Sequence, residues 1–538
     1  MADEGQEKEK LQRKKGANLM KNLFKKIGAL LVAAIMVLSM CTAVFADDTT
    51  NATIIVKTPD GNALAINGEN PATIWCIQVI EPDQTAETGW KFTTETVETV
   101  FKSNLGNVDA QTAIKMLANK AWQDAGLQSL KYANVGIATS AQFEAALAAV
   151  TKDATDANKV SANPIPVTKA GVYAIKAAQD GYTYKEMAAY VGFSDSMTVT
   201  GNVNVDAKRS SKVIEKNVEE TDHVVAIGDV KTYTVKTEVP AFTPTDANKY
   251  FAVKDAITGA EYVKNGEDVA VTVTVDGKPI KDYKIVMGKG TFTIILKDNR
   301  ADKEAVDAKV TANNESVIND SNSYYAKEVV VTYRATITDV TATNTAYGNV
   351  GSDEKSSTPV GLYTGTIKVI KKETNSDKLL PNAKFVVYRE NNGKKEYAKL
   401  TDDGKLAGWT EAVNSDVKDD IKNGNTKGIG IIVTDAKGEA TVSGLDLGDY
   451  YFEEVEAPTG YSLDANPNKV TVTLKEKVKE ASATTDVISN PLTKYNTTLN
   501  SLPSTGGMGT YLFTIIGVVV MAGAAGAFFI SRRKGSEE

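Results

Sequence analysis

Short segments in which apolar and polar residues alternate run through most of the chain and constrain its fold more than any other feature. Clear examples are 269–275 and 470–474, in which Val or Leu recurs at every second position. Turn signals such as Asp276-Gly277 and Asn392-Gly393 interrupt these segments. Alternation places every second side chain on one face of a strand, and such turns join antiparallel strands. The pattern predicts a mainly β protein made of tandem immunoglobulin-like β-sandwiches.

The length of 538 residues and shifts in composition predict three domains between two terminal segments. The first domain, 47–205, is expected to add helices to its strands. The second, 206–355, and the third, 356–495, are nearly all β in their pattern. Residues 351–359 are rich in Ser, Gly and charge, so we expect a linker between the second and third domains.

Two segments of the first domain carry helical signals. Asp109 can cap a helix that has apolar residues on one face and ends at Gly126. Ser140 can cap a second helix, which carries Phe143 and Leu147 on one face. We expect both helices to cover a sheet rather than to form a binding site.

The N-terminal segment, 1–46, has the features of a secretory signal peptide. Three lysines between 21 and 26 precede a short apolar run, 27–40, and Ala46 supplies the small residue at which a signal peptidase cuts. The polar residues before Met20 are unlike such a leader, so we expect Met20 to be the natural start. We expect cleavage after Ala46 and secretion of the remainder.

Reactive side chains are scarce in the secreted part. Cys76 is its only cysteine, so no internal disulfide can reinforce it, and His223 is the only histidine of the chain. Metal sites and His-based catalysis depend on these residue types. The net charge of -7 argues against nucleic acid as a partner. We therefore expect no metal, no cofactor and no independent enzymatic activity, and some other form of reinforcement.

The C-terminal segment, 496–538, combines a short motif, an apolar run at 511–530 and a basic tail. The motif consists of Leu502, Pro503, Ser504, Thr505 and Gly506. Twenty helical residues span about 30 Å, the thickness of a bilayer core, and a basic tail stays in the cytoplasm. A plain membrane anchor would show the last two features, but all three in this order resemble the cell-wall sorting signal of sortase substrates. The resemblance implies that a sortase attacks the Thr505 carbonyl, releases Gly506 onward and transfers the acyl group to an amine.

Three polar residues of the third domain fall on strand faces that otherwise carry core residues. They are Lys371, Glu454 and Asn490, each of which lies two positions after an apolar residue. A single buried Lys or Glu is costly, so three such residues call for a joint explanation.

The sequence around two of these residues resembles Cna-B-type domains of Gram-positive pilins and adhesins. Residues 448–461 (GDYYFEEVEAPTGY) resemble the E-box of these domains, and 366–371 (TIKVIK) resemble their first strand. The resemblance implies that Lys371 attacks the side-chain amide of Asn490, assisted by Glu454, and forms an isopeptide bond with release of ammonia. Burial favours the neutral amine and the protonated acid that this reaction needs.

Two alternatives to this reaction remain open in the third domain. A buried Lys371–Glu454 ion pair without any bond would place the same side chains on the same faces. Lys372 is a rival nucleophile, although its face of the strand is expected to be wetter.

The second domain repeats the arrangement with Lys216, Asp255 and Asn344 on strand faces otherwise given to apolar residues. Residues 227–233 and 250–255 resemble the middle domain of backbone pilins. The resemblance implies that Asp255 assists a bond between Lys216 and Asn344. Asn349 is an alternative partner, and ordinary polar groups at strand ends are the plainer interpretation.

The first domain departs from this arrangement. Residues 171–177 mimic the run into the E-box, but Ala177 stands where the third domain has Glu454. Without an acid we expect no bond of this kind.

Shaft pilins carry a linkage lysine in a Tyr-Pro-Lys-Asn motif near the end of the first domain. Residues 203–209 (VNVDAKR) occupy that place, although Asp206-Ala207 replaces Tyr-Pro. The resemblance implies that Lys208 accepts the Thr505 acyl group of the next subunit. Lys212 is the nearest rival, and a solvated charge in a linker is the plainer interpretation.

Together these features predict a structural subunit of a sortase-assembled pilus shaft on a Gram-positive cell wall. The expected partners are a pilin-specific sortase, identical subunits, peptidoglycan through a housekeeping sortase, and accessory pilins. The alternative is a wall-anchored adhesin or minor pilin whose first domain binds a host or matrix ligand.

Overall fold

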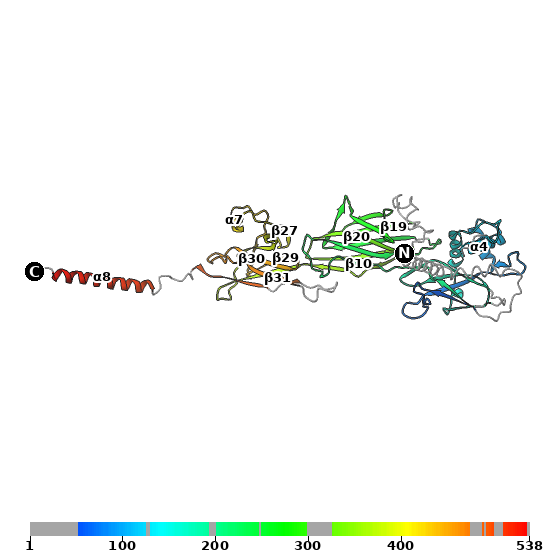
Figure 1. Ribbon diagram of the computed structural model, residues 1–538, viewed down its shortest axis with the longest axis horizontal. Coiled ribbons are helices and arrows are strands. Elements are labelled where there is room, and N and C mark those ends of the chain that lie inside the picture. The colour runs from blue at the N-terminus through cyan, green and yellow to red at the C-terminus, as the bar shows by residue number, and fades with distance from the viewer. Residues whose placement is uncertain are drawn as a thin grey trace, which may run out of the picture.

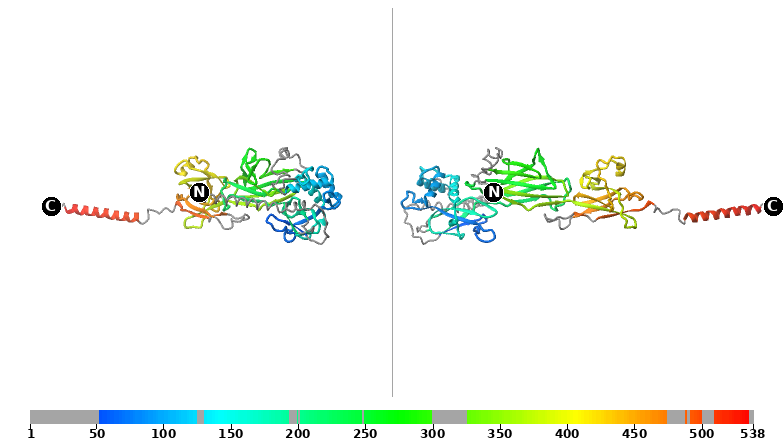
Figure 2. Two further views of the ribbon diagram at one scale, coloured as in Figure 1. Left: turned by 45° about the vertical axis from the view of Figure 1, so that its right-hand side comes forward. Right: turned by 180° about the vertical axis from the view of Figure 1, so that it is seen from behind.

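The computed structural model describes residues 52–124, 130–192, 199, 201–246, 249–298, 325–473, 487–488, 491–499 and 509–534. Three β-rich domains follow one another along the long axis of the molecule, and helix α8 (Gly509–Lys534) extends beyond the third (Figure 1). Figure 2 shows the same row of domains from two further sides. The structure confirms the mainly β fold and the helices expected in the first domain. The predicted signal peptide, 1–46, lies outside the described residues.

The first domain has two main sheets, with strand orders β4-β1-β8 and β3-β2-β5-β7. The strands are β1 (Ala52–Lys57), β2 (Thr73–Pro82), β3 (Trp90–Phe92), β4 (Ile165–Val167), β5 (Gly171–Ala178), β6 (Tyr182–Tyr184), β7 (Met187–Val191), β8 (Gly201–Asp206) and β9 (Arg209–Ser211). β1 and β8 run parallel, so the start and the end of this domain lie side by side.

Three α-helices lie among the described residues of the first domain, and the sequence predicted two of them. The helices are α3 (Glu95–Asn104), α4 (Ala110–Asp124) and α5 (Ser140–Lys152), and η1 (Asp156–Asn158) is a short 3-10 turn. The cap of α5 is Thr139 rather than Ser140, because Thr139 forms a reciprocal capping box with Gln142. The unpredicted helix, α3, buries Val97 and Phe101 on one face.

The second domain is a sandwich of two antiparallel sheets. Their orders are β10-β11-β20-β16-β17 and β18-β19-β12-β21-β22, with β13 added to β20 and β23 added to β21, and β14 pairs with β15. The strands are β10 (Glu215–Val218), β11 (Val230–Glu238), β12 (Tyr250–Thr258), β13 (Ala260–Tyr262), β14 (Lys264–Asn265), β15 (Asp268–Val269), β16 (Val271–Val275), β17 (Lys278–Ile280), β18 (Lys284–Gly288), β19 (Thr291–Asp298), β20 (Glu328–Ile337), β21 (Thr341–Val350), β22 (Asp353–Ser356) and β23 (Val360–Tyr363). The predicted turn at Asp276-Gly277 joins β16 to β17, and both residues have positive φ.

The predicted linker at 351–359 is wrong. Within it, β22 folds back and pairs antiparallel with β21, opposite Tyr347 to Val350. The buried core of the second domain then continues to Leu362. The polar composition that suggested a linker suits an edge strand, because charged and polar side chains there face water.

The third domain is a second sandwich. One sheet has the order β29-β24-β32 with β33 also on β24, and the other has the order β27-β26-β25-β30-β31 with β28 on β25. The strands are β24 (Gly365–Glu373), β25 (Lys384–Asn391), β26 (Lys394–Leu400), β27 (Leu406–Thr410), β28 (Ile432–Val433), β29 (Glu439–Leu445), β30 (Gly448–Glu456), β31 (Asn468–Val472), β32 (Val487–Ile488) and β33 (Leu492–Asn496), and α7 (Val417–Lys422) is a short helix. The turn at Asn392-Gly393 joins β25 to β26 as predicted.

The second and third domains share a hydrogen-bonded junction. Val224 and Ala226, which precede β11 in the second domain, are buried in the core cluster of the third. The Ile227 N–H donates to the Gly444 carbonyl at 2.9 Å. A segment of one domain is therefore built into the other.

Helix α8 includes the apolar run for which the sequence predicted a membrane span at 511–530. Among the residues that the structure describes, no helix is long and apolar enough to cross a membrane. The predicted span is not borne out there.

Candidate cross-linking sites

The interior of the second domain brings together Lys216 of β10, Asp255 of β12 and Asn344 of β21. The Lys216 and Asp255 side chains are completely buried, and Lys216 Nζ lies 2.5 Å from Asp255 Oδ2. Because β10 belongs to one sheet and β12 and β21 to the other, Lys216 reaches across the sandwich. The alternation of the three strands produces this meeting, since it turns all three side chains inward.

Two tyrosine hydroxyls complete this polar cluster, and the sequence had not predicted either. The Tyr333 hydroxyl lies 2.5 Å from Lys216 Nζ and accepts a hydrogen bond from Asn344 Nδ2 at 2.8 Å. The Tyr262 hydroxyl donates to Asp255 Oδ1 at 2.9 Å. Both rings lie on inward faces, where an aromatic residue looks like ordinary core in the sequence.

The environment of the second-domain lysine favours its neutral form. Burial lowers the pKa of Lys216, and the neighbouring Asp255 carboxylate opposes this shift. Asn344 Oδ1 is buried and accepts no hydrogen bond. The alternative partner, Asn349, donates instead to Glu354 at 2.9 Å on the exposed side of β21, so the structure brings Asn344 to Lys216.

The third domain buries Lys371 of β24 against Glu454 of β30, in the facing sheet. Both side chains are completely buried, and Lys371 Nζ lies 3.2 Å from Glu454 Oε1. The other carboxylate oxygen, Oε2, accepts the Asp464 N–H at 2.8 Å. Lys372, the rival nucleophile, points to the surface, where it pairs with Asp377 at 3.1 Å.

Among the residues that the structure describes, Asn496 is the asparagine that meets this pair. Asn496 Nδ2 donates to Glu454 Oε2 at 3.1 Å, the residue is buried, and its Oδ1 accepts no hydrogen bond. Asn490 lies outside the described residues. The sequence did contain a signal for Asn496, because Leu492, Lys494 and Asn496 alternate along one strand face.

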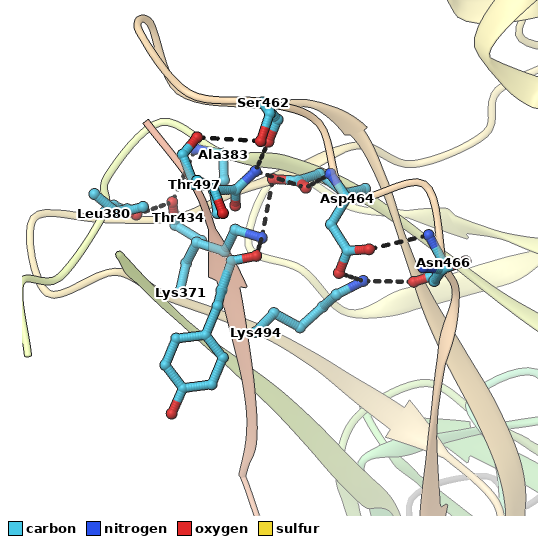
Figure 3. A network of polar contacts seen from close by, with 12 residues as sticks. Lys371, Leu380, Ala383, Thr434, Ser462, Asp464, Asn466, Lys494 and Thr497 are labelled. Carbon is cyan, nitrogen blue, oxygen red and sulfur yellow. Dashed lines mark hydrogen bonds and ion pairs between the residues drawn. The ribbon is translucent and has the colours of Figure 1, made fainter. Parts of the chain in front are cut away.

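A second buried lysine, Lys494, stands beside Lys371. β24 and β33 run parallel, and their register places Lys371 opposite Lys494. Lys494 Nζ lies 3.2 Å from Asp464 Oδ2 and donates to the Asn466 carbonyl at 2.8 Å (Figure 3). Burial lowers the pKa of Lys371; Glu454 opposes this shift, and the charge of Lys494 adds to it.

The first domain has a methyl group where the third domain has its acid. Ala177 lies on β5 and is buried in the core of the domain. The expectation that this domain forms no bond of the same kind remains a prediction.

The two candidate linkage lysines lie at the junction of the first and second domains. Lys208, between β8 and β9, is 40% exposed, and its Nζ lies 3.3 Å from Glu144 Oε1. Lys208 borders a hollow of about 420 Å³ that is also lined by Phe143 and Tyr325. Lys212 is 15% exposed and pairs with Asp353 at 2.6 Å, so Lys208 is the more accessible amine.

Comparison with known families bears on the C-terminal half of the chain. A model of the prealbumin-like fold domain matches residues 365–486, and a model of the LPXTG cell wall anchor motif matches residues 494–537. The motif itself, Leu502 to Gly506, lies outside the described residues. The anchor match decides where the protein resides. The chain is a cell-wall-anchored surface protein of the Gram-positive type.

Comparisons over most of the chain find similarity to one bacterial surface protein and to solved structures of major pilins. The chain is 24% identical over 457 residues to the trypsin-resistant surface T6 protein of Streptococcus pyogenes serotype M6, covering 66% of this chain and 77% of the relative. The T6 backbone pilin structure matches with a TM-score of 0.46 and 16% identity, covering 80% of this chain and 81% of that one. The full-length major pilin SpaD of Corynebacterium diphtheriae matches with a TM-score of 0.42 and 14% identity, covering 84% and 97%.

Proposed function

We propose that this cell-wall-anchored protein is the shaft subunit of a sortase-polymerised pilus, and that its second and third domains each form an autocatalytic Lys–Asn isopeptide bond. One observation carries the proposal. In each domain a completely buried lysine lies within 3.2 Å of a completely buried carboxylate, and a buried asparagine amide belongs to the same polar cluster. The wall anchor and the similarity to the T6 surface protein support the pilus assignment.

In the second domain the bond joins Lys216 to Asn344. Asp255 takes a proton from the Lys216 ammonium and leaves a neutral amine, which attacks the amide carbon of Asn344. Ammonia leaves, and the bond ties one sheet of the sandwich to the other. A buried ion pair alone contributes little to stability, so the unbonded alternative gives no reason for burying these groups together.

In the third domain the bond joins Lys371 to Asn496, with Glu454 as the acid. Asn496 takes the place of Asn490 because its amide reaches the Glu454 carboxylate. The reacting residues lie on neighbouring parallel strands, near the two ends of the domain. A bond here closes nearly the whole domain into one covalent loop.

Intact mass spectrometry of the secreted chain tests both bonds. We expect a mass lower than the sequence mass by two molecules of ammonia, and cross-linked peptides that join Lys216 to Asn344 and Lys371 to Asn496. Asn496→Ala should restore one ammonia, whereas Asn490→Ala should change nothing beyond the substitution itself. The full sequence mass in the unaltered chain would refute the two bonds, and the reverse result for the two alanine variants would return the third-domain bond to Asn490.

Polymerisation requires an amine for the Thr505 acyl group, and we assign it to Lys208 because it is the more exposed candidate. A pilin-specific sortase joins subunits, a housekeeping sortase attaches the completed fibre to peptidoglycan, and accessory pilins are further partners. Lys208→Ala should abolish the ladder of covalent multimers in cell-wall extracts, and the matched variant Lys212→Ala should preserve it. A chain that occurs only as a wall-linked monomer, without any ladder, would favour the adhesin or minor pilin instead.

A further inference from the structure

The Tyr333 hydroxyl touches both nitrogens that change partners in the second-domain reaction. Its oxygen lies 2.5 Å from Lys216 Nζ and 2.8 Å from Asn344 Nδ2. The nucleophile must lose a proton, and the leaving amide nitrogen must gain one. Tyr333 therefore stands between the group that gives up a proton and the group that receives it.

The surroundings of Tyr333 hold this hydroxyl in place and keep it protonated. Its ring stacks on Tyr233 at a centroid distance of 5.6 Å and meets Phe292 edge to face at 4.9 Å. Burial raises the pKa of the Tyr333 hydroxyl, and the neighbouring charge of Asp255 raises it further. A hydroxyl that is held in place and protonated can give up its proton to one nitrogen while it takes a proton from the other.

A neighbouring tyrosine shows that ring packing alone does not account for the position of this hydroxyl. Tyr233 is equally buried and lies directly across the strand pair from Tyr333. Its ring faces Lys216, whose Nζ lies 5.1 Å from the ring centroid. Tyr333 differs from it because its hydroxyl reaches the reacting groups themselves.

We propose that Tyr333 is a catalytic residue of the second-domain bond, where it relays a proton from the attacking lysine to the departing ammonia. This inference rests on the Lys216–Asn344 bond proposed above. The proposal adds a tyrosine to the lysine and the acid. Tyr333 acts after the lysine has attacked the amide carbon, when the ammonia leaves.

The steps balance as follows. Lys216 passes one proton to Asp255, and its neutral amine then bonds to the amide carbon of Asn344, which leaves positive charge on Nζ and negative charge on Oδ1. Tyr333 gives its hydroxyl proton to Nδ2 while it takes a proton from Nζ. The bond from the carbon to Nδ2 breaks, its electron pair leaves with ammonia, and Oδ1 becomes a carbonyl oxygen again. Tyr333 ends unchanged, and Asp255 holds the proton from Lys216.

The third domain supplies an internal control because its asparagine is held differently. Asn496 Nδ2 donates directly to the Glu454 carboxylate, which also lies 3.2 Å from Lys371 Nζ. One acid there contacts both reacting side chains. A defect in Tyr333 should therefore leave the third-domain bond unaffected within the same molecule.

The experiment follows bond formation in the full secreted chain. The chain is synthesised without cells, kept unfolded in denaturant, diluted into buffer and quenched at intervals for intact-mass measurement. The unaltered chain should lose two ammonia molecules. Tyr333→Phe should lose the first at the normal rate and the second about 100-fold more slowly, as expected for removal of a proton-transferring group. Tyr233→Phe is the matched control and should lose both at normal rates.

A second variant keeps both the aromatic ring and the hydroxyl and changes chiefly the acidity of the hydroxyl. Tyr333 is replaced by 3,5-difluorotyrosine, whose hydroxyl is more acidic. The second-domain rate should change severalfold while the third-domain rate stays constant, even if Tyr333→Phe fails to fold in this domain. Two rapid losses in Tyr333→Phe, or an unchanged second-domain rate with difluorotyrosine, would overturn the relay. No loss in the unaltered chain would instead refute the underlying bonds.

Discussion

The second and third domains bring a lysine, an acid and an asparagine together through different strand arrangements. In the second domain, Lys216 lies in one sheet, whereas Asp255 and Asn344 lie in the other. In the third domain, Lys371 and Asn496 lie on adjacent parallel strands of one sheet, and only Glu454 comes from the facing sheet. One proposed bond ties two sheets together, and the other ties the first strand to the last within a sheet.

The comparison shows which structural features the two sites share and which they do not. In both domains the lysine and the acid have no exposed side-chain surface, so burial is the shared feature and strand order is not. Each acid also receives a second hydrogen bond, from the Tyr262 hydroxyl to Asp255 and from the Asp464 N–H to Glu454. Two different pairings of strands therefore bring a lysine, an acid and an asparagine together in a buried site.

Mechanical stretching between residues 208 and 505 gives the largest expected difference between bonded and unbonded domains. The unaltered protein should show no unfolding extension from the second or third domain, because each bond joins residues near both ends of its domain. Lys216→Ala and Lys371→Ala should each release about 125 residues, roughly 430 Å of extended chain. Single-molecule force spectroscopy measures these lengths.

The matched control for stretching is Lys469→Ala, which removes an exposed lysine paired with Asp449 and should release no length. Two full unfolding steps in the unaltered protein would contradict the placement of both bonds on the force path. The first domain should contribute no extension if Lys208 is the point of attachment, since force then enters after that domain.

Removal of the acids tests whether the two sites act independently. In Asp255→Ala and in Glu454→Ala, one of the two bonds should fail to form, so that only one ammonia is lost. The free energy of unfolding of the affected domain should fall by about 5 kcal/mol, by analogy with a disulfide that closes a loop of more than 100 residues. The double variant should have the full mass, and each domain should show only its own loss. Mass spectrometry and denaturant unfolding measure the two effects.

Glu456→Ala serves as the control for the acid variants, because this exposed carboxylate pairs with Lys384 outside the site. It should keep both bonds and nearly all of the stability. A Glu454→Ala chain that still forms the third-domain bond would assign the acid role to another residue.

A smaller effect of pH is expected in the first domain, which lacks the proposed reinforcement. Glu186 is buried, its Oε2 accepts no hydrogen bond, and burial raises its pKa to about 7. The folded domain holds this proton more tightly than the unfolded chain, so stability falls as pH rises from about 5 through 7. The maximum loss is about 3 kcal/mol.

Denaturant unfolding of the full secreted chain at pH 5 and pH 8 measures the pH effect in the first transition. Glu186→Gln should abolish most of the difference, and Glu98→Gln, which changes a partly exposed carboxylate on α3, should preserve it. An equally stable first domain at both pH values would show that Glu186 does not ionise within a packed interior.

The strand faces were predictable from the sequence, but several contacts between strands were not. Alternation turned Lys371 and Glu454 inward, and the structure buries both. The same pattern favoured Asn490, which lies two positions after Ile488, over Asn496, which lies two positions after a lysine, Lys494. Lys494 is buried because Asp464 and Asn466 approach it from far along the chain. Pairing register of this kind is set by packing and is not encoded in one strand.

Among helices and turns too, features with local causes were predicted from the sequence and features that depend on distant contacts were not. Asp276-Gly277 and Asn392-Gly393 form the expected turns, because their backbone angles are a local property. Helix α3 was missed because its Val and Thr residues favour strands in isolation, and burial of Val97 and Phe101 stabilises it instead. Tyr333 was missed because an inward tyrosine looks the same in a sequence whether its hydroxyl is used or not.

The junction between the second and third domains determines how such a subunit bends. Gly444 has a φ of +84°, and a side-chain carbon there would lie 2.6 Å from Ile227 Cδ1, so the two domains are in close contact at this position. Lys405 and Asp339 add a contact across the same boundary at 3.1 Å. We expect two sandwiches joined in this way to turn together under load, so that the pair transmits torque as well as tension. A fibre of these subunits would then flex chiefly where one subunit is attached to the next, and its curvature would be set once per subunit rather than once per domain.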